Sequence, residues 1–162
     1  MGYPGGSNCS DVVSGWTIVI EGEDRVKRIS GKLASTYKPG TLVYQSGVET
    51  WTSADSGESL LLCGWADFKM RTSSTFGEVD IDADFATTDN IEIVVGPRDS
   101  TIKIAALCDN MSAAKYYGEP LSVGATDGRL ALQKAYASYL TQAICTEDST
   151  TLLVGWNRVY IV

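Results

Sequence analysis

The stretch TLVYQSGVETW, from Thr41 to Trp51, contains two short runs of β-branched and aromatic residues on either side of Ser46-Gly47. Two such runs around a small residue and a glycine are typical of a tight β-hairpin. We therefore expect an antiparallel pair of strands here, with the turn at Ser46-Gly47.

Short β-rich runs of this kind recur along the chain, and turn residues separate them about every 8 to 12 positions. The other expected strands are WTIVIEG (Trp16 to Gly22), SLLLCGWADFKM (Ser59 to Met70), NIEIVVGP (Asn90 to Pro97), STIKIAAL (Ser100 to Leu107), ATDGRLAL (Ala125 to Leu132) and TLLVGWNRVYIV (Thr151 to Val162). No internal repeat is visible among them. Together with the 16 glycines, this pattern predicts an all-β fold, a compact antiparallel barrel or sandwich with short strands.

Glycines mark the expected turns and irregularities. The residues 96–99 are expected to join two of the strands into a second hairpin, and Asp127-Gly128 predicts a type I′ turn. Gly64 and Gly155 stand inside strand patterns, where an isolated glycine indicates a bulge or a bend.

Helix is expected in one or two short pieces at most. MSAAKYYG, from Met111 to Gly118, suits one or two helical turns that end at the glycine. LQKAYASYLTQAI, from Leu132 to Ile144, has a helical stripe but directly follows a predicted hairpin, and we expect loop plus strand with a short helix. Residues 1–14 are rich in Gly, Ser and Asn and predict a flexible N-terminal arm, which leaves 15–162 as a single β-rich domain.

The composition excludes several classes of function. The chain of 162 residues has no histidine, so Ser–His–Asp and Cys–His catalysis are excluded on a single chain. Its formal net charge of −7 argues against nucleic acid or an anionic membrane as a partner. The first ten residues lack the pattern of a signal peptide, and the apolar runs are too short to span a membrane, so we expect synthesis in the cytoplasm.

The stretch EVDIDADF, from Glu78 to Phe85, places Asp80, Asp82 and Asp84 at every second position. This alternation predicts a half-buried strand whose acidic face meets water or a partner. A calcium loop of the EF-hand type is disfavoured, because Phe85 replaces the required glycine. A looser metal site at these three aspartates, or a pair of catalytic carboxylates among them, is the lesser alternative, and no cofactor is expected.

Four cysteines lie too far apart for the usual zinc pattern. Cys63 and Cys145 are expected to be small buried residues, although disulfides stay open. Lys103 alternates with isoleucines and is interpreted as a surface lysine rather than a Schiff-base lysine. The tryptophans, at positions 16, 51, 65 and 156, are expected in a core or an interface, with a sugar-stacking platform as the alternative.

Several stretches, in this order, resemble the small capsid decoration proteins, also called head-stabilising or cement proteins, of tailed viruses of bacteria and archaea. They are YKPGTLVYQSG, LLLCGWADF, DNIEIVVGP, GEPLSVGATDGRLAL and the ending QAICTEDSTTLLVGWNRVYIV. The resemblance covers about Lys38 to Val162 and consists of strands and turns. It implies a compact β-barrel domain that assembles as a homotrimer on the outer capsid surface of the virion and clamps subunits of the major capsid protein together, often through an N-terminal arm.

This resemblance implies no catalytic residues, and we expect no enzyme. In the arm and at its root, Tyr3, Pro4 and Trp16 are the predicted contacts with the capsid partner. Two alternatives stay open: another virion part, such as a head spike, neck or tail-tube component, and a soluble carbohydrate- or metal-binding β module.

Overall fold

The computed structural model describes residues 17–55, 63–69, 87, 89–109, 118–132, 141–145 and 155–162. Within these residues the chain forms eleven strands and one short 3-10 helix, Glu23–Arg25. The prediction of an all-β fold with barrel sheets, short strands and little helix is therefore confirmed. No helix in these ranges is long and apolar enough to cross a membrane.

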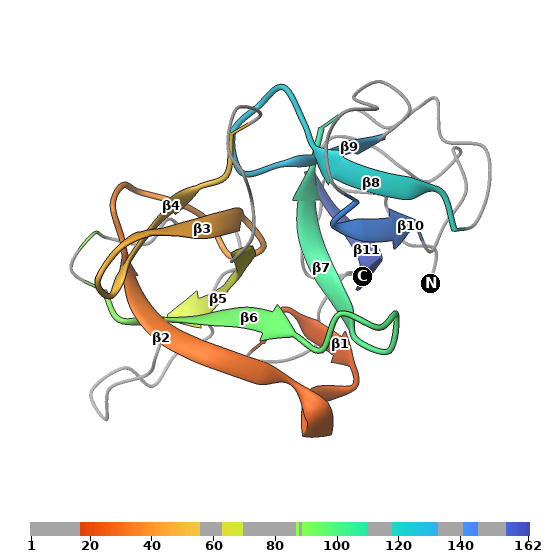
Figure 1. Cartoon of the computed structure of the whole chain (residues 1–162), viewed down its shortest axis with the longest axis horizontal. Helices are drawn as coiled ribbons and strands as arrows, with labels where there is room; N and C mark the ends of the chain where they lie inside the picture. The colour runs from red at the N-terminus through yellow and green to blue at the C-terminus, as the bar shows by residue number, and fades with distance from the viewer. Residues whose placement is uncertain are drawn as a thin grey trace.

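The first half of the chain forms a closed five-stranded barrel (Figure 1). Its strands are β2 (Lys27–Leu33), β3 (Leu42–Gly47), β4 (Thr50–Ser53), β5 (Cys63–Lys69) and β6 (Ile91–Gly96). The order around the barrel is β2-β4-β3-β5-β6, and only the pairing of β2 with β4 is parallel.

The second half, together with one strand from the start of the described chain, forms a six-stranded sheet, which lies beside the barrel in Figure 1. Its strands are β1 (Val19–Glu21), β7 (Lys103–Cys108), β8 (Pro120–Val123), β9 (Leu130–Leu132), β10 (Ala143–Cys145) and β11 (Gly155–Ile161). The order is β1-β7-β11-β10-β8-β9, and a further parallel pairing of β7 with β9 closes five of these strands into a ring.

The two rings have the same topology. In each ring the first strand runs parallel to the third, the third pairs with the second, the second with the fourth, the fourth with the fifth, and the fifth with the first. The chain is thus a pair of barrels built on one plan, although the sequence shows no internal repeat. Strand β1 is the exception, because it precedes the first barrel in the chain but pairs with β7 of the second.

The expected hairpin at residues 96–99 is wrong. Strand β6 pairs with β2 and β5, whereas β7 pairs with β1, β11 and β9, so these residues cross from one barrel to the other. Gly96-Pro97 correctly marks a change of direction, but a turn signal does not choose the strand partners. Both strands are largely buried, because each contributes side chains to the core of the structure.

The hairpin at 41–51 is confirmed, with its turn two residues later than predicted. Gly47 pairs with Thr50, so the turn is Val48-Glu49, and Glu49 adopts a left-handed φ of 58°. A register shift between Gln45 and Gly47 absorbs the difference.

The hairpin at Asp127-Gly128 also forms, between β8 and β9, but its connection spans residues 124–129. Gly128 has a φ of 76°, while Asp127 is not left-handed, so the turn is not of type I′. A Cβ atom at Gly128 would lie 2.4 Å from Thr41 Cγ2 of the first barrel. Glycine is required here because the turn packs closely against the other barrel as well as for its φ.

Gly64 does not form the expected bulge. It pairs in regular register with Val43, and the irregularity of β5 lies between Ala66 and Lys69. A Cβ atom at Gly64 would lie 2.5 Å from the Val94 carbonyl oxygen, so close strand packing explains the glycine. The predicted bend at Gly155 is confirmed by its φ of 119° at the start of β11.

The buried side chains form two clusters. The smaller cluster fills the first barrel around Trp51, whereas the larger one contains residues of both barrels, among them Trp65 and Leu121. Trp51, Trp65 and Trp156 are buried as predicted, and so are Cys63 and Cys145; Cys108, for which no prediction was made, is buried as well. Shared burial of this kind holds the two barrels together by the hydrophobic effect.

Some expectations fall outside the described residues. They concern the arm at 1–14, the acidic strand at 78–85, all but the last residue of the helical turns expected at 111–118, and residues 133–140 of the segment 132–144. The division into an arm and a single domain from residue 15 stays a prediction.

Candidate functional site

The residues predicted to bind the capsid partner, Tyr3, Pro4 and Trp16, lie outside the described residues. The same holds for the acidic residues Asp80, Asp82 and Asp84. Among the residues that the structure describes, no group of three or more Cys, Asp or Glu side chains could hold a metal ion. The candidate site lies around Thr17, the first residue that the structure describes.

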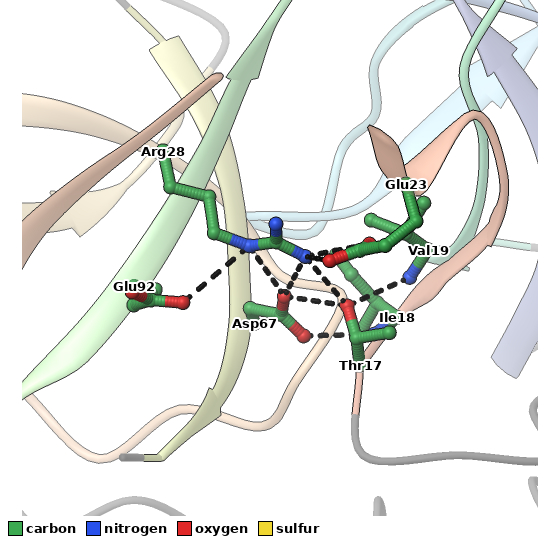
Figure 2. A network of polar contacts seen from close by, with 7 residues as sticks. All are labelled: Thr17, Ile18, Val19, Glu23, Arg28, Asp67 and Glu92. Carbon is green, nitrogen blue, oxygen red and sulfur yellow. Dashed lines mark hydrogen bonds and ion pairs between the residues drawn. The ribbon is translucent and has the colours of Figure 1, made fainter. Parts of the chain in front are cut away.

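A buried carboxylate holds the first described residues to the first barrel (Figure 2). Asp67 lies on β5, at the irregular part of that strand, and its side chain is only 4% exposed. Its Oδ1 accepts the Ile18 backbone N–H at 2.7 Å, and its Oδ2 accepts the Thr17 hydroxyl at 2.7 Å. The segment that enters β1 is thus attached to β5, which is 49 residues further along the chain.

Arg28 of β2 completes this Arg28–Asp67 network. Its Nη2 donates to Asp67 Oδ2 at 3.1 Å, to the Thr17 hydroxyl at 3.0 Å and to Glu23 Oε2 at 2.8 Å. Its Nε donates to Asp67 Oδ2 at 3.2 Å and lies 3.4 Å from Glu92 Oε2. Burial opposes the charge of Arg28, but the bond to Glu23 and the charge of Asp67 outweigh it and raise the pKa of the guanidinium.

The members of the network differ in energetic weight. Breaking a buried ion pair by removing one partner typically costs about 3–5 kcal/mol, because the other charge stays uncompensated. This applies to Asp67, which is buried beside an arginine that is 19% exposed. Glu23 and Glu92 are 55% and 40% exposed, and exposed pairs contribute about 0–1 kcal/mol. Asp67 therefore attaches Thr17 and Ile18 to the first barrel, while the Ile18 carbonyl oxygen also accepts the Ala105 backbone N–H of the second barrel at 2.8 Å.

A second arginine joins the two barrels. Arg98, in the crossing segment, donates through Nη2 to the Cys63 carbonyl oxygen at 2.8 Å and through Nη1 to Gln142 Oε1 at 2.9 Å. Nη1 also donates to the Val162 carbonyl oxygen at 3.2 Å, and the guanidinium lies 5.2 Å from the centre of the Trp65 ring. This Arg98 junction uses one side chain to connect β5, β10 and the end of β11.

The thiol of Cys63 is part of the Arg98 junction. It lies 2.9 Å from Arg98 Nη2 and donates to Gln142 Oε1 at 3.0 Å. Burial raises the pKa of the Cys63 thiol, although the nearby charge of Arg98 opposes this effect. The group is thus a protonated donor at neutral pH rather than a reactive thiolate.

Lys103 is a surface lysine, as interpreted from the sequence, but it is a partnered one. It forms an ion pair with Glu21 and lies 5.0 Å from the centre of the Tyr160 ring. Burial opposes its charge, but the bond to Glu21 prevails and raises the pKa of Lys103. A Schiff-base lysine needs a lowered pKa, so the environment is opposite to what that chemistry requires.

Little in the sequence indicates either arginine network. Arg28 and Asp67 are 39 residues apart, and Arg98 and Gln142 are 44 apart. One clue was available: Asp67 stands alone inside the apolar run of β5, and a carboxylate there must find a partner.

Comparison with models of protein families finds no match for this chain, and comparison with curated proteins finds none either.

Proposed function

We propose that this protein is a structural virion component that binds the outer surface of the capsid and stabilises contacts between major capsid protein subunits. It acts as a decoration protein and assembles as a homotrimer. The proposal combines the resemblance of residues 38–162 to such proteins with the arrangement of the two arginine networks. It involves no catalytic step.

The observation that carries the proposal is the attachment of Thr17 and Ile18 to Asp67. The residues predicted to contact the capsid, up to Trp16, precede this point directly. Whatever they bind is thus attached to the body of the protein at Thr17 and Ile18, which Asp67 holds with hydrogen bonds at 2.7 Å. A fixed point of departure reduces the entropy lost when such a segment binds.

The contacts between the barrels also support a role in which the protein transmits strain between capsid subunits. The Trp156 indole N–H donates to the Pro39 carbonyl oxygen at 2.8 Å, and backbone bonds join Leu107 to Gly40 at 2.9 Å and Leu42 to Gly128 at 2.8 Å. Together with the Arg98 junction, they connect the barrels at several points. A protein that clamps neighbouring subunits must transmit strain across its body, and densely packed interiors do so.

The test is co-sedimentation with purified capsids of a tailed virus. We expect the full chain to bind and to raise the resistance of the capsids to heat and shear, while a variant lacking residues 1–14 binds at least tenfold more weakly. A variant with alanine in place of Tyr3, Pro4 and Trp16 tests the same contacts without shortening the chain, and it should bind as weakly as the deletion. Circular dichroism and the melting temperature check that each variant is folded.

Two results would contradict the proposal. One is that neither form binds and capsid resistance is unchanged. The other is that mass measurement in solution and on capsids gives a hexameric ring instead of a trimer at capsid axes, which would indicate a neck or tail-tube component.

A further inference from the structure

Strands β2 and β7 hold the same place in the two barrels, but β7 has more neighbours. On one side β7 pairs with β11, from Lys103 onward. On its other side β1 pairs with the first half of β7, with Val19 opposite Ile104 and Glu21 opposite Lys103. The end of β7 pairs with β9 at Cys108. Strand β7 is therefore paired along both edges.

Strand β2 shows the same arrangement with one strand fewer. On one side β6 pairs with residues 27–31, whereas on the other side β4 pairs only with Lys32 and Leu33. Among the residues that the structure describes, no strand lies beside 27–30 on that second side (Figure 1). The two parallel pairings can be superimposed so that Leu33 of β2 takes the place of Cys108 of β7. Ile29 of β2 then takes the place of Ile104 of β7. The open edge of β2 thus corresponds to the edge of β7 that β1 covers.

The backbone at this open edge is directed outward. The N–H of Lys32 donates to Glu49 of the β4 side at 2.8 Å, and the N–H of Ala34 donates to Trp51 at 2.7 Å. Because successive residues of a strand direct their N–H groups to opposite sides, the N–H groups of Arg28 and Ser30 also face away from β6. An unpaired edge of this kind is a template for an added strand.

The side chains along the open edge of β2 determine which charge an added strand should carry. Lys27, Ser30 and Lys32 are exposed, in a chain whose net charge is −7. Two β2 strands from two copies would bring these lysines together and repel each other, whereas an acidic strand would be attracted. The pairing of β1 with β7 is a precedent within the same molecule, since Glu21 forms an ion pair with the lysine opposite to it.

We propose that residues 27–30 of β2 bind an acidic, extended segment of a partner protein by strand addition, as β1 binds β7. The segment places an apolar residue opposite Ile29, as Val19 lies opposite Ile104, and its carboxylates lie near Lys27 and Lys32. The binding needs no cleft, because backbone hydrogen bonds provide the affinity and the charges provide the selectivity.

Amide hydrogen exchange of the full chain tests whether the edge is open. We expect the Arg28 and Ser30 amides to exchange fast, and the Ile29 and Gly31 amides, which face β6, to be protected at least a hundredfold more. The probe is a synthetic peptide, GEVDIDADFAT, which copies the sequence of residues 77–87 of this chain and stands in for a partner's acidic segment because it alternates apolar residues with aspartate. Its addition should slow exchange at Arg28 and Ser30. Protection of these amides without the peptide would overturn the proposal, and if that protection rose with protein concentration the occupant would be a second copy.

Variants separate backbone pairing from charge. Ser30→Pro removes the outward N–H and should weaken peptide binding at least tenfold, while Ser30→Ala keeps the N–H and should bind normally. The double variant Lys27→Glu with Lys32→Glu should weaken binding tenfold, whereas Lys27→Arg with Lys32→Arg, which keeps both charges, should not. A peptide with asparagine in place of aspartate should bind more weakly than the acidic one. Equal binding across these pairs would overturn the proposal, and capsid binding that survives in Ser30→Pro would leave the proposed function untouched.

Discussion

The Arg28–Asp67 network and the Arg98 junction are built on the same side chain but oppose its charge in different ways. Arg28 faces three carboxylates, of which one is buried. Arg98 donates to two backbone carbonyl oxygens, one amide oxygen and the Cys63 sulfur, and lies over an aromatic ring. The first network depends on paired charges, so its outer members are screened by salt. The second places one cation among neutral acceptors, and its strength depends on geometry.

The largest effect is expected from Asp67→Ala. The substitution leaves Arg28, the Ile18 N–H and the Thr17 hydroxyl without their acceptor, and should lower the free energy of unfolding by about 3–5 kcal/mol. Urea denaturation measures this change. Glu92→Ala, at an exposed member of the same network, is the control and should cost about 1 kcal/mol or less. Equal losses of unfolding free energy in the two variants would mean that Asp67 and Glu92 contribute equally to stability in spite of their different burial.

Arg98→Ala should come next, with a loss of about 1.5–3 kcal/mol, the range for hydrogen bonds that involve a charged group. Arg98→Lys keeps the charge but cannot reach Cys63 and Gln142 with two separate N–H groups, so it should recover less than half of the loss. The stability of both variants relative to the unsubstituted chain should change little between low and high salt. A strong dependence of this stability difference on salt would mean that the Arg98 junction, like the exposed ion pairs of Arg28, depends on charges that salt can screen.

A pair of glycines tests the packing between the barrels. Gly128 and Gly118 both have a left-handed φ, of 76° and 86°. A Cβ atom at Gly128 would meet Thr41, whereas at Gly118 it would meet none of the described residues within 4 Å. Gly118→Ala should therefore cost about 1 kcal/mol from backbone strain alone, and Gly128→Ala about 2 kcal/mol or more. Equal melting temperatures for the two variants would show that the turn at 124–129 does not pack on the first barrel.

The smallest effect is expected from Glu21→Gln at the surface pair with Lys103. The hydrogen bond from Lys103 lowers the pKa of Glu21, and the lowered value belongs to the folded state. A carboxylate with a lowered folded pKa contributes stability above its unfolded pKa and loses it as the pH falls through the folded one. The difference between the two proteins should thus be present at pH 7 and vanish in acid. Thermal melts between pH 7 and pH 3 measure it, and a difference that persists at the acid end would contradict the assignment.

The sequence predicted what local pattern determines. Alternating apolar residues and glycines gave the strands, both hairpins around positions 47 and 128, and the burial of three tryptophans. It failed where distant segments choose their partners. Gly96-Pro97 reads as a hairpin turn, but β6 and β7 find better burial in separate barrels, and no local signal reports that choice.

The candidate site was less accessible to sequence reasoning for the same reason. Asp67 and Arg28 meet only because β2 and β5 both pair with β6, which is a property of barrel closure. Arg98 looked like an ordinary turn residue, since its four acceptors come from three distant segments.

Strand β1 has a consequence for how the two halves of the chain can exist. It precedes the first barrel in the chain but pairs with β7 of the second barrel. Residues 96–102 then connect β6 of the first barrel to β7 of the second, so the chain joins the two barrels at two separate places. Neither half of the polypeptide is therefore a self-contained unit. Cleavage by a protease within 97–102 should leave two fragments that stay clasped to one another and separate only under denaturing conditions.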